Sequence, residues 1–293
     1  MKLSVVVPAF NEEKLLAGTL ACIHEAARGW SYELIVSDNT STDRTADIAR
    51  AAGARVVFEP VNQISRARNA GAAAASGDWL LFIDADCSPS RALFADLRHE
   101  IERGACIGGG CTVRLAGAPP AVRFWVAAWN ALSRTLSWAA GSFFFCEARA
   151  FRELGGFSHE LYAAEEIDLS RRLKRRGRLA ILHRQPLVTS GRKAQLYSWR
   201  EHLAFLVRMT LSGGRALRRR EDCSVWYDGR RSRAGPMTRA ISPGAGKRPS
   251  RCLENTSLPS AKTSSTPLSP LISSGSTPSS RRSSSARLTA RGR

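Results

Sequence analysis

The chain has 293 residues, 43% of them apolar, and a formal net charge of +19. This length allows one α/β domain with additional segments, or two small domains. The charge is uneven: residues 229–293 hold 13 of the 44 basic residues and one of the 25 acidic residues, and therefore 12 of the 19 net charges. A basic chain suggests nucleic acid or an anionic membrane as a partner, but this distribution favours a basic appendage on an ordinary domain.

The seven cysteines are scattered, odd in number and without a Cys-x-x-Cys pair. This pattern argues against a disulfide framework or a zinc site and favours reduced thiols in a cytosolic setting. The first residues lack the pattern of a signal peptide, and no apolar run reaches the ~18 residues that a spanning helix needs. We therefore expect a cytoplasmic protein, peripheral at most to the inner face of the membrane.

Apolar runs and amphipathic stretches alternate through the first 100 residues. Strands are predicted at residues 3–8, 33–37, 55–58 and 79–83. Helices are predicted from Asn11 as N-cap to about Ala27, from the loop 38–43 to Gly53, over 65–76, and from Ser88 as N-cap onward. The alternation predicts an α/β fold with a mostly parallel, Rossmann-like central sheet that is covered by helices on both faces. Ligands of such sheets bind beyond the carboxyl ends of the strands.

The second half is less regular. Strands are predicted at 106–113, 142–146 and 179–183, and helices at 119–138, 148–154, 166–176 and 195–211. The helix 119–138 aligns Trp125, Trp129, Leu132 and Leu136 along one side. Core packing is the default interpretation of this stripe. An acceptor-binding wall and an interfacial membrane contact, supported by nearby arginines, are the alternatives.

Residues 229–293 contain 16 Ser and 7 Pro and show no hydrophobic period. Such a segment cannot bury enough apolar surface to offset the entropy of ordering. We predict one folded domain at 1–228, followed by a disordered basic tail at 229–293. The change after Asp228 is abrupt, and out-of-frame translation of a GC-rich gene would give the same composition.

Asp84 and Asp86 directly follow the strand predicted at 79–83. In extended backbone, residues i and i+2 point the same way, which would aim both carboxylates at one spot. Hard oxygen ligands suit Mg²⁺ or Mn²⁺, and such a metal bridging a diphosphate would stabilise the charge of a leaving nucleotide. Taken alone, two acids at a strand end are as often a turn or a helix cap.

Other polar residues fall at the same end of the sheet. Asp38 lies in the loop after the second strand, where its carboxylate could accept a hydrogen bond from a nucleotide base, whereas Asp43 is favoured as a helix cap. Arg66 and Arg68 open the helix that precedes the aspartate pair. A helix N-terminus with guanidinium groups is a favourable site for a diphosphate.

Taken together, these segments resemble glycosyltransferase family 2. The likeness is carried by residues 5–13, 37–43, 67–71, 77–86, 151–157 and 165–173, and covers roughly 3–192. The resemblance implies a GT-A fold and an inverting transfer from a nucleoside-diphosphate sugar. It implies that the nucleotide is lined by Pro8, Ala9 and Glu12, that Asp38 contacts the base, that Asp84 lies near ribose and metal, and that Asp86 is the direct metal ligand.

The resemblance also implies a general base in the acidic pair Glu165–Glu166. The usual base occupies the position of Glu166, where Asp is more common; because Glu is one methylene longer, the base could shift to Glu165. Ser37-Asp38 leaves one acid where the family often has two. The Gln-x-x-Arg-Trp motif of processive synthases is absent, which favours transfer of a single sugar. The sugar, the base and the acceptor are not identified: a sugar, a lipid-linked or a small-molecule acceptor would each fit.

Other functions remain open. A sugar nucleotidyltransferase would be expected to have a glycine-rich phosphate loop near the first strand, which residues 8–13 lack. A non-enzymatic protein could bind polyanions through the basic tail, although nucleic acid is not favoured as a partner. A folded but inactive paralogue is the third alternative.

Overall fold

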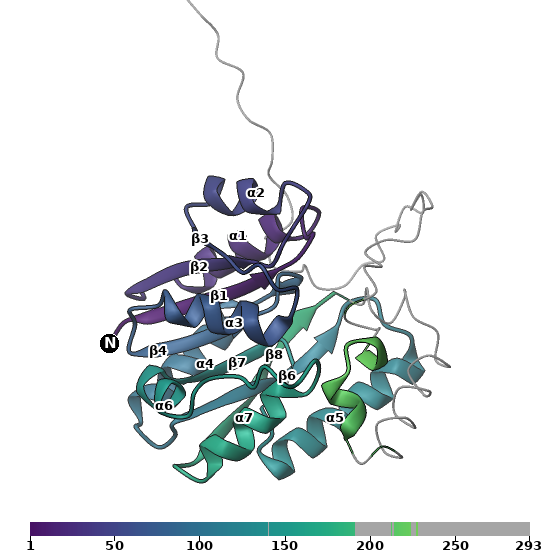
Figure 1. Cartoon of the computed structure of the whole chain (residues 1–293). Coiled ribbons are helices and arrows are strands. Elements are labelled where there is room, and N and C mark those ends of the chain that lie inside the picture. The colour runs from purple at the N-terminus through teal and green to yellow at the C-terminus, as the bar shows by residue number, and fades with distance from the viewer. Residues whose placement is uncertain (140, 191–211, 213, 224–226, 228–293) are drawn as a thin grey trace, which may run out of the picture. The chain divides into compact units, whose positions relative to one another are not determined.

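The computed structural model describes residues 1–139, 141–190, 212, 214–223 and 227 (Figure 1). The helix predicted at 195–211 and the tail predicted at 229–293 lie outside these residues. No helix in the described ranges is long and apolar enough to cross a membrane.

Within the described residues, eight strands form one mixed sheet. They are β1 (Leu3–Ala9), β2 (Tyr32–Asp38), β3 (Arg55–Phe58), β4 (Trp79–Ile83), β5 (Cys87–Ser88), β6 (Gly108–Leu115), β7 (Phe143–Glu147) and β8 (Leu179–Thr189). Their order is β3-β2-β1-β4-β7-β6-β8-β5. The first four strands are parallel neighbours, which confirms the predicted parallel half. β7 runs antiparallel to β4 and β6, β8 is parallel to β6, and β5 is antiparallel to β8.

Helices cover both faces of this sheet, as predicted. They are α1 (Leu16–Ala26), α2 (Thr45–Ala51), α3 (Ile64–Ala73), α4 (Arg91–Glu102), α5 (Pro120–Leu136), α6 (Ala148–Glu153) and α7 (Glu165–Lys174), with two short 3-10 helices, η1 (Arg215–Arg218) and η2 (Glu221–Cys223). Alternation along β1 separates the two cores: Leu3, Val5 and Val7 pack with residues of α1 and α4, whereas Val6 packs with residues of α3, α6 and α7. The six described cysteines are buried free thiols.

Two predicted helix starts are wrong. Asn11 has a left-handed φ of 52°, and its side-chain oxygen accepts from the N–H of Thr42 at 2.8 Å, so it binds the next loop while α1 begins at Leu16. Ser88 pairs with β8 as part of β5. The cap of α4 is Ser90, whose hydroxyl accepts from the N–H of Leu93 at 3.1 Å.

Core packing of the aromatic stripe on α5 is also wrong for half of its members. Trp125 is 71% exposed and Leu132 is 44% exposed, while Trp129 and Leu136 are half-buried. The reason is Asn130, whose side-chain amide accepts from the N–H of Val113 at 3.0 Å and donates to its C=O at 2.9 Å. This pair of hydrogen bonds turns the polar Asn130 side of the helix toward β6 and the aromatic side outward.

Candidate functional site

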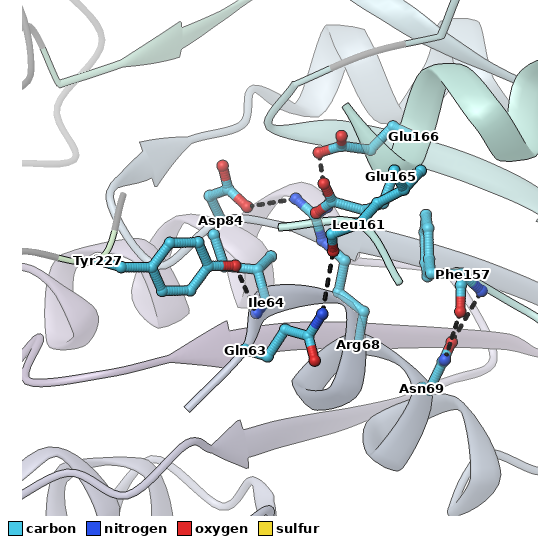
Figure 2. A network of polar contacts seen from close by, with 10 residues as sticks. All are labelled: Gln63, Ile64, Arg68, Asn69, Asp84, Phe157, Leu161, Glu165, Glu166 and Tyr227. Atoms are coloured by element: carbon cyan, nitrogen blue, oxygen red, sulfur yellow. Dashed lines mark hydrogen bonds and ion pairs between the residues drawn. The ribbon is translucent and has the colours of Figure 1, made fainter. Parts of the chain in front are cut away.

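The candidate site lies where β1, β2 and β4 end and where α3 and α7 begin. Its centre is the buried guanidinium of Arg68 on α3, which three carboxylates surround (Figure 2). Nη1 lies 2.8 Å from Oε1 of Glu165 and 2.5 Å from Oε1 of Glu166, and Nη2 lies 3.0 Å from Oδ1 of Asp84. The ring of Phe157 lies 5.4 Å from the guanidinium carbon. Sequence segments almost 100 residues apart thus meet on one cation.

The charges of this cluster do not balance. Burial alone would lower the pKa of Arg68, but the three carboxylates raise it above its ordinary value, so the guanidinium stays charged. Burial, reinforced by Glu166, raises the pKa of Glu165 although Arg68 opposes the shift. Nε of Arg68 is buried without a hydrogen-bond partner among the residues that the structure describes. Three carboxylates around one guanidinium favour the uptake of a proton or of a further cation.

The segment Ala67–Gly71 places Arg68 in the cluster. A Cβ on Gly71 would lie 2.3 Å from Cγ1 of Val6, so the glycine allows α3 to pack closely on β1. Two residues earlier, the side chain of Asn69 donates to the C=O of Phe157 at 2.8 Å and accepts from its N–H at 3.0 Å (Figure 2). Asn69 therefore ties the loop before α7 to α3.

Two further features aim α7 at the cluster. The side-chain nitrogen of Gln63 donates to the C=O groups of His159 at 2.7 Å and Leu161 at 3.0 Å. Ala164, just before α7, has a left-handed φ of 60°, which costs a residue with a Cβ about 1–2 kcal/mol. Held strain of this kind is often found at functional sites. Here it directs Glu165 and Glu166 back toward α3.

Asp84 and Asp86 lie close in sequence, but their side chains have different partners. The chain turns after Ile83, so the premise of an extended Asp84–Asp86 segment is wrong. Asp84 faces Arg68, whereas Asp86 accepts from the hydroxyls of Ser190 at 2.5 Å and Thr189 at 3.5 Å. β8 reaches Asp86 because it continues to Thr189, beyond the predicted strand end at 183.

The donor chemistry of the two aspartates still fits Mg²⁺ or Mn²⁺. Within the described ranges no three His, Cys, Asp or Glu side chains are grouped to hold a metal ion. These ions commonly bind through one or two carboxylates, with waters and substrate phosphates as the other ligands, so a site with two carboxylates is sufficient.

The candidate nucleotide residues line the ends of β1 and β2. Pro8 and Ala9 pair in register with Ser37 and Asp38. The carboxylate of Asp38 is buried and accepts from the N–H of Ser41 at 3.2 Å. The loops here are held in unusual conformations, since Thr40, a β-branched residue, has a φ of 66°.

Two acids flank these loops. Glu12 is buried, and its N–H donates to the hydroxyl of Thr45 at 2.8 Å. The carboxylate of Asp43 accepts from the N–H of Thr45, the first residue of α2, at 2.9 Å, but the N-cap position itself is held by Arg44, so the predicted cap is displaced by one residue. Partial burial would raise the pKa of Asp43, but hydrogen bonds, first among them those from Thr45, lower it.

The N-terminus of α3 already has a partner. The N–H of Ile64 donates to the hydroxyl of Tyr227 at 3.2 Å (Figure 2), and burial raises the pKa of that hydroxyl. Arg66 donates from Nε to Oε1 of Gln63 at 3.2 Å and is not among the partners of Arg68. The structure therefore brings Arg68, Asp84, Glu165 and Glu166 together and leaves Arg66 outside that cluster.

Sequence reasoning did not single out Gln63 or Tyr227, and it gave no role to Asn69 or Phe157, although both lie in segments that carry the family resemblance. A polar Asn69 in an alanine-rich helix was a usable signal. Tyr227 carried none, because its contact with Ile64 spans 163 residues.

Comparisons with known proteins agree on the family. Residues 4–152, about half of the chain, match the model of glycosyl transferase family 2. An uncharacterized glycosyltransferase of Mycobacterium tuberculosis is 38% identical over 114 residues, which are 39% of this chain and 50% of the relative. The chain thus spans about half the length of the curated relatives it matches.

Solved structures support the fold. A mannosyltransferase from Pyrobaculum calidifontis, in complex with GDP-Man and Mn²⁺, superposes with a TM-score of 0.56 at 22% identity, covering 72% of this chain and 63% of the other. A glucosyl-3-phosphoglycerate synthase from Mycobacterium tuberculosis, in complex with Mn²⁺, UDP-Glc and phosphoglyceric acid, gives 0.51 at 23% identity, with 73% and 78% covered. The mixed sheet with helices on both faces is the GT-A fold, and the chain belongs to glycosyl transferase family 2.

Proposed function

We propose that this chain is an inverting, non-processive glycosyltransferase that moves one sugar from a nucleoside-diphosphate sugar to an acceptor hydroxyl. The observation that carries the proposal is the acidic cluster at the carboxyl ends of the parallel strands, beside Asp86, in a chain of this family. We assign residues 1–228 to the transferase domain and 229–293 to a basic tail outside it.

Glu166 is the proposed general base. It would take the proton of the acceptor hydroxyl as the oxygen attacks the anomeric carbon, and the nucleoside diphosphate would leave from the opposite face. Its side chain is 11% exposed, against 4% for Glu165, so it is the more accessible carboxylate of the pair. Arg68 bonds both glutamates and holds them in place. The buried Glu165 is then a positioning residue, and it is the alternative base if Glu166 is dispensable.

Asp86, with Asp84 in support, would hold Mg²⁺ or Mn²⁺. The ion would supply positive charge next to the diphosphate of the leaving group. Two observations support this: the excess of carboxylates around Arg68, and Mn²⁺ in complexes of proteins with the same fold. Binding of the donor also involves the chain's own residues: Pro8, Ala9 and Glu12 would line the nucleotide and Asp38 would contact the base.

Fewer residues are free to contact the diphosphate than the sequence suggested. Arg66 and the N–H groups that open α3 remain candidates for the phosphates. Arg68 is occupied by carboxylates, so it would act on the phosphates only after a rearrangement of the cluster. Tyr227 would have to leave, or share, the N–H of Ile64.

We propose that the acceptor enters beside α7. A cavity of about 920 Å³ there is lined by Trp138, Leu161, Ala164, Arg171 and Arg215, among others. The guanidinium of Arg171 lies 5.2 Å from the ring centre of Trp138, and aromatic faces stack on sugars. The cavity adjoins the start of α7, where the two glutamates lie.

A thermal-stability screen tests the donor and metal assignments. A nucleoside-diphosphate sugar at 100 times its Kd should stabilise the protein by about 2.7 kcal/mol, and more strongly with Mn²⁺ than without. Asp86→Ala should abolish the additional stabilisation that depends on Mn²⁺. Asp47→Ala is the matched control, because Asp47 is an exposed acid on α2 whose ion pair is with Arg50. A screen in which no donor stabilises the protein, or an Asp86→Ala variant with undiminished Mn²⁺ dependence, would contradict the proposal.

A further inference from the structure

The outer side of α5 is an exposed apolar surface, which we call the α5 face. It comprises Phe124, Trp125, Ala128, Ala131 and Leu132, all exposed. Phe124 is 68% and Trp125 71% exposed, and their rings contact each other edge to face with centroids 5.8 Å apart. A contiguous exposed apolar patch of this kind marks an interaction site on a soluble domain.

The orientation of this face is set by hydrogen bonds on the opposite side of the helix. The side chain of Asn130 pairs with both backbone polar groups of Val113 on β6. The hydroxyl of Ser133 donates to the C=O of Trp138 at 2.6 Å and fixes the end of α5. In Figure 1, α5 lies beside β6, in the half of the sheet away from β3. The aromatic side chains therefore point outward because the helix is anchored.

The surroundings of the α5 face are basic. Between Glu102 and Glu147 the sequence contains no Asp or Glu. Arg123 and Arg134 are both exposed and lie 11 residues apart, about three helical turns, so they flank the apolar arc along one edge. Neither forms an ion pair with any residue in the described ranges.

A cavity of about 890 Å³ continues this basic edge between α5 and β6. Its lining includes Arg114, Arg123, Arg134 and His183, together with Thr112, Asn130 and apolar residues. Among the described residues that line this cavity there is no Asp or Glu. The cavity thus offers several cationic donors next to an apolar surface, which is the chemistry that an anionic lipid headgroup with its acyl chains requires.

We propose that α5 is an interfacial anchor that binds the anionic surface of a lipid bilayer. Phe124, Trp125 and Leu132 enter the boundary between headgroups and acyl chains, and Arg123 and Arg134 contact lipid phosphates. A helix with an apolar arc, a rim of arginines and aromatic residues is suited to this position. Charge complementarity decides for a bilayer over a second copy of the chain, because the face and its rim offer no acid to pair with their own arginines. The inference does not rest on the proposed function.

Flotation of the full chain with vesicles tests this surface. The protein should float with vesicles of phosphatidylcholine and phosphatidylglycerol, and far less with phosphatidylcholine alone. Phe124→Ser/Trp125→Ser should lower the bound fraction about tenfold or more, and Arg123→Gln/Arg134→Gln should lower it comparably. Because all four side chains are exposed, the thermal unfolding midpoints should stay near that of the unchanged protein.

The matched control is Phe58→Ser/Val61→Ser, which removes two other exposed apolar side chains, 63% and 44% exposed. This control should bind vesicles as the unchanged protein does. Binding that survives Phe124→Ser/Trp125→Ser would assign the attraction to the basic segment 229–293 and overturn the proposal. Absence of binding to anionic vesicles would also overturn it, as would a dimer in solution that only the α5 variants dissociate.

Discussion

Replacing Arg68 with methionine should destabilise the protein strongly. The change keeps much of the side-chain length but removes a cation that contacts Glu165, Glu166 and Asp84. The side chains of the two glutamates are 4% and 11% exposed, so water cannot solvate them in place of the guanidinium. Breaking a buried ion pair of this kind costs about 3–5 kcal/mol. Asp84 is 28% exposed and contributes less.

The loss of stability in Arg68→Met should depend on pH. The pKa of Glu165 is raised in the folded protein, so its protonated form contributes stability that is present below the ordinary glutamate value of 4.5 and is lost as pH rises through the raised value. Without Arg68 that pKa rises further. The difference in unfolding free energy between the unchanged protein and Arg68→Met should therefore be largest at neutral and higher pH and shrink toward pH 4.5.

Urea unfolding at several pH values measures this difference. Arg66→Met is the control, because Arg66 lies on the same helix and is hydrogen-bonded only to Gln63 in the contacts the structure records. Its cost should stay within about 0.5 kcal/mol. The double variant Arg68→Met/Glu165→Gln should recover part of the loss, since it removes one uncompensated acid. If Arg68→Met were as stable as the control at neutral pH, the buried cluster would not be the electrostatic centre described above.

Two further predictions concern the placement of α3. Gly71→Ala should lower the free energy of unfolding by about 1–3 kcal/mol, because the new Cβ would lie 2.3 Å from Val6. Gly18→Ala on α1 is the control: its new Cβ would meet nothing within 4 Å, and the change should stabilise the protein by about 0.4–1 kcal/mol. Thermal unfolding of both variants measures the two effects, and equal effects would contradict close packing of α3 on β1. Asn69→Ala should cost about 1–3 kcal/mol, since the N–H and C=O of Phe157 lose their partner, and it should lower the turnover number more than donor affinity because the loop before α7 loosens. An Asn69→Ala enzyme with unchanged stability and turnover would show that this loop is held by other contacts.

The sequence predicts the parallel half of the sheet well because its signals are local. The strand at 79–83 is fully buried on both faces and was recognisable as a continuous apolar run. Helix starts were less predictable. Asn11 and Ser88 both carry the side chains of good caps, but tertiary contacts use them otherwise: Asn11 binds the loop of Thr42, and Ser88 joins a strand.

The amphipathic period predicted for α5 is present in the helix, but the period does not determine how the helix is oriented on the sheet. A period says which residues share a side and not which side is buried. The hydrogen bonds between Asn130 and Val113 determine which side of α5 is buried. This contact joins two elements, and no local sequence pattern reveals it. The exposed Trp125 is the consequence.

The acidic cluster shows the same limit. Each of its members was a predicted site residue: Asp84 and Arg68 were predicted from their positions at a strand end and a helix start, and Glu165 and Glu166 from the resemblance to the family. Arg68 was expected to contact phosphates, yet it binds Glu165 and Glu166, 97 and 98 residues away. Only the packing of α3 against the loop before α7 determines this pairing.

The identity of the general base is the most direct test of the account. With a donor selected by the stability screen, the rate of sugar transfer or of donor hydrolysis should be measured for Glu166→Gln and Glu165→Gln, together with donor affinity. We predict that Glu166→Gln lowers the rate by about 10²–10⁴-fold with donor affinity retained, and that Glu165→Gln has a smaller effect. A Glu166→Gln enzyme with the full rate would contradict the account, and a large loss in Glu165→Gln alone would exchange the two roles.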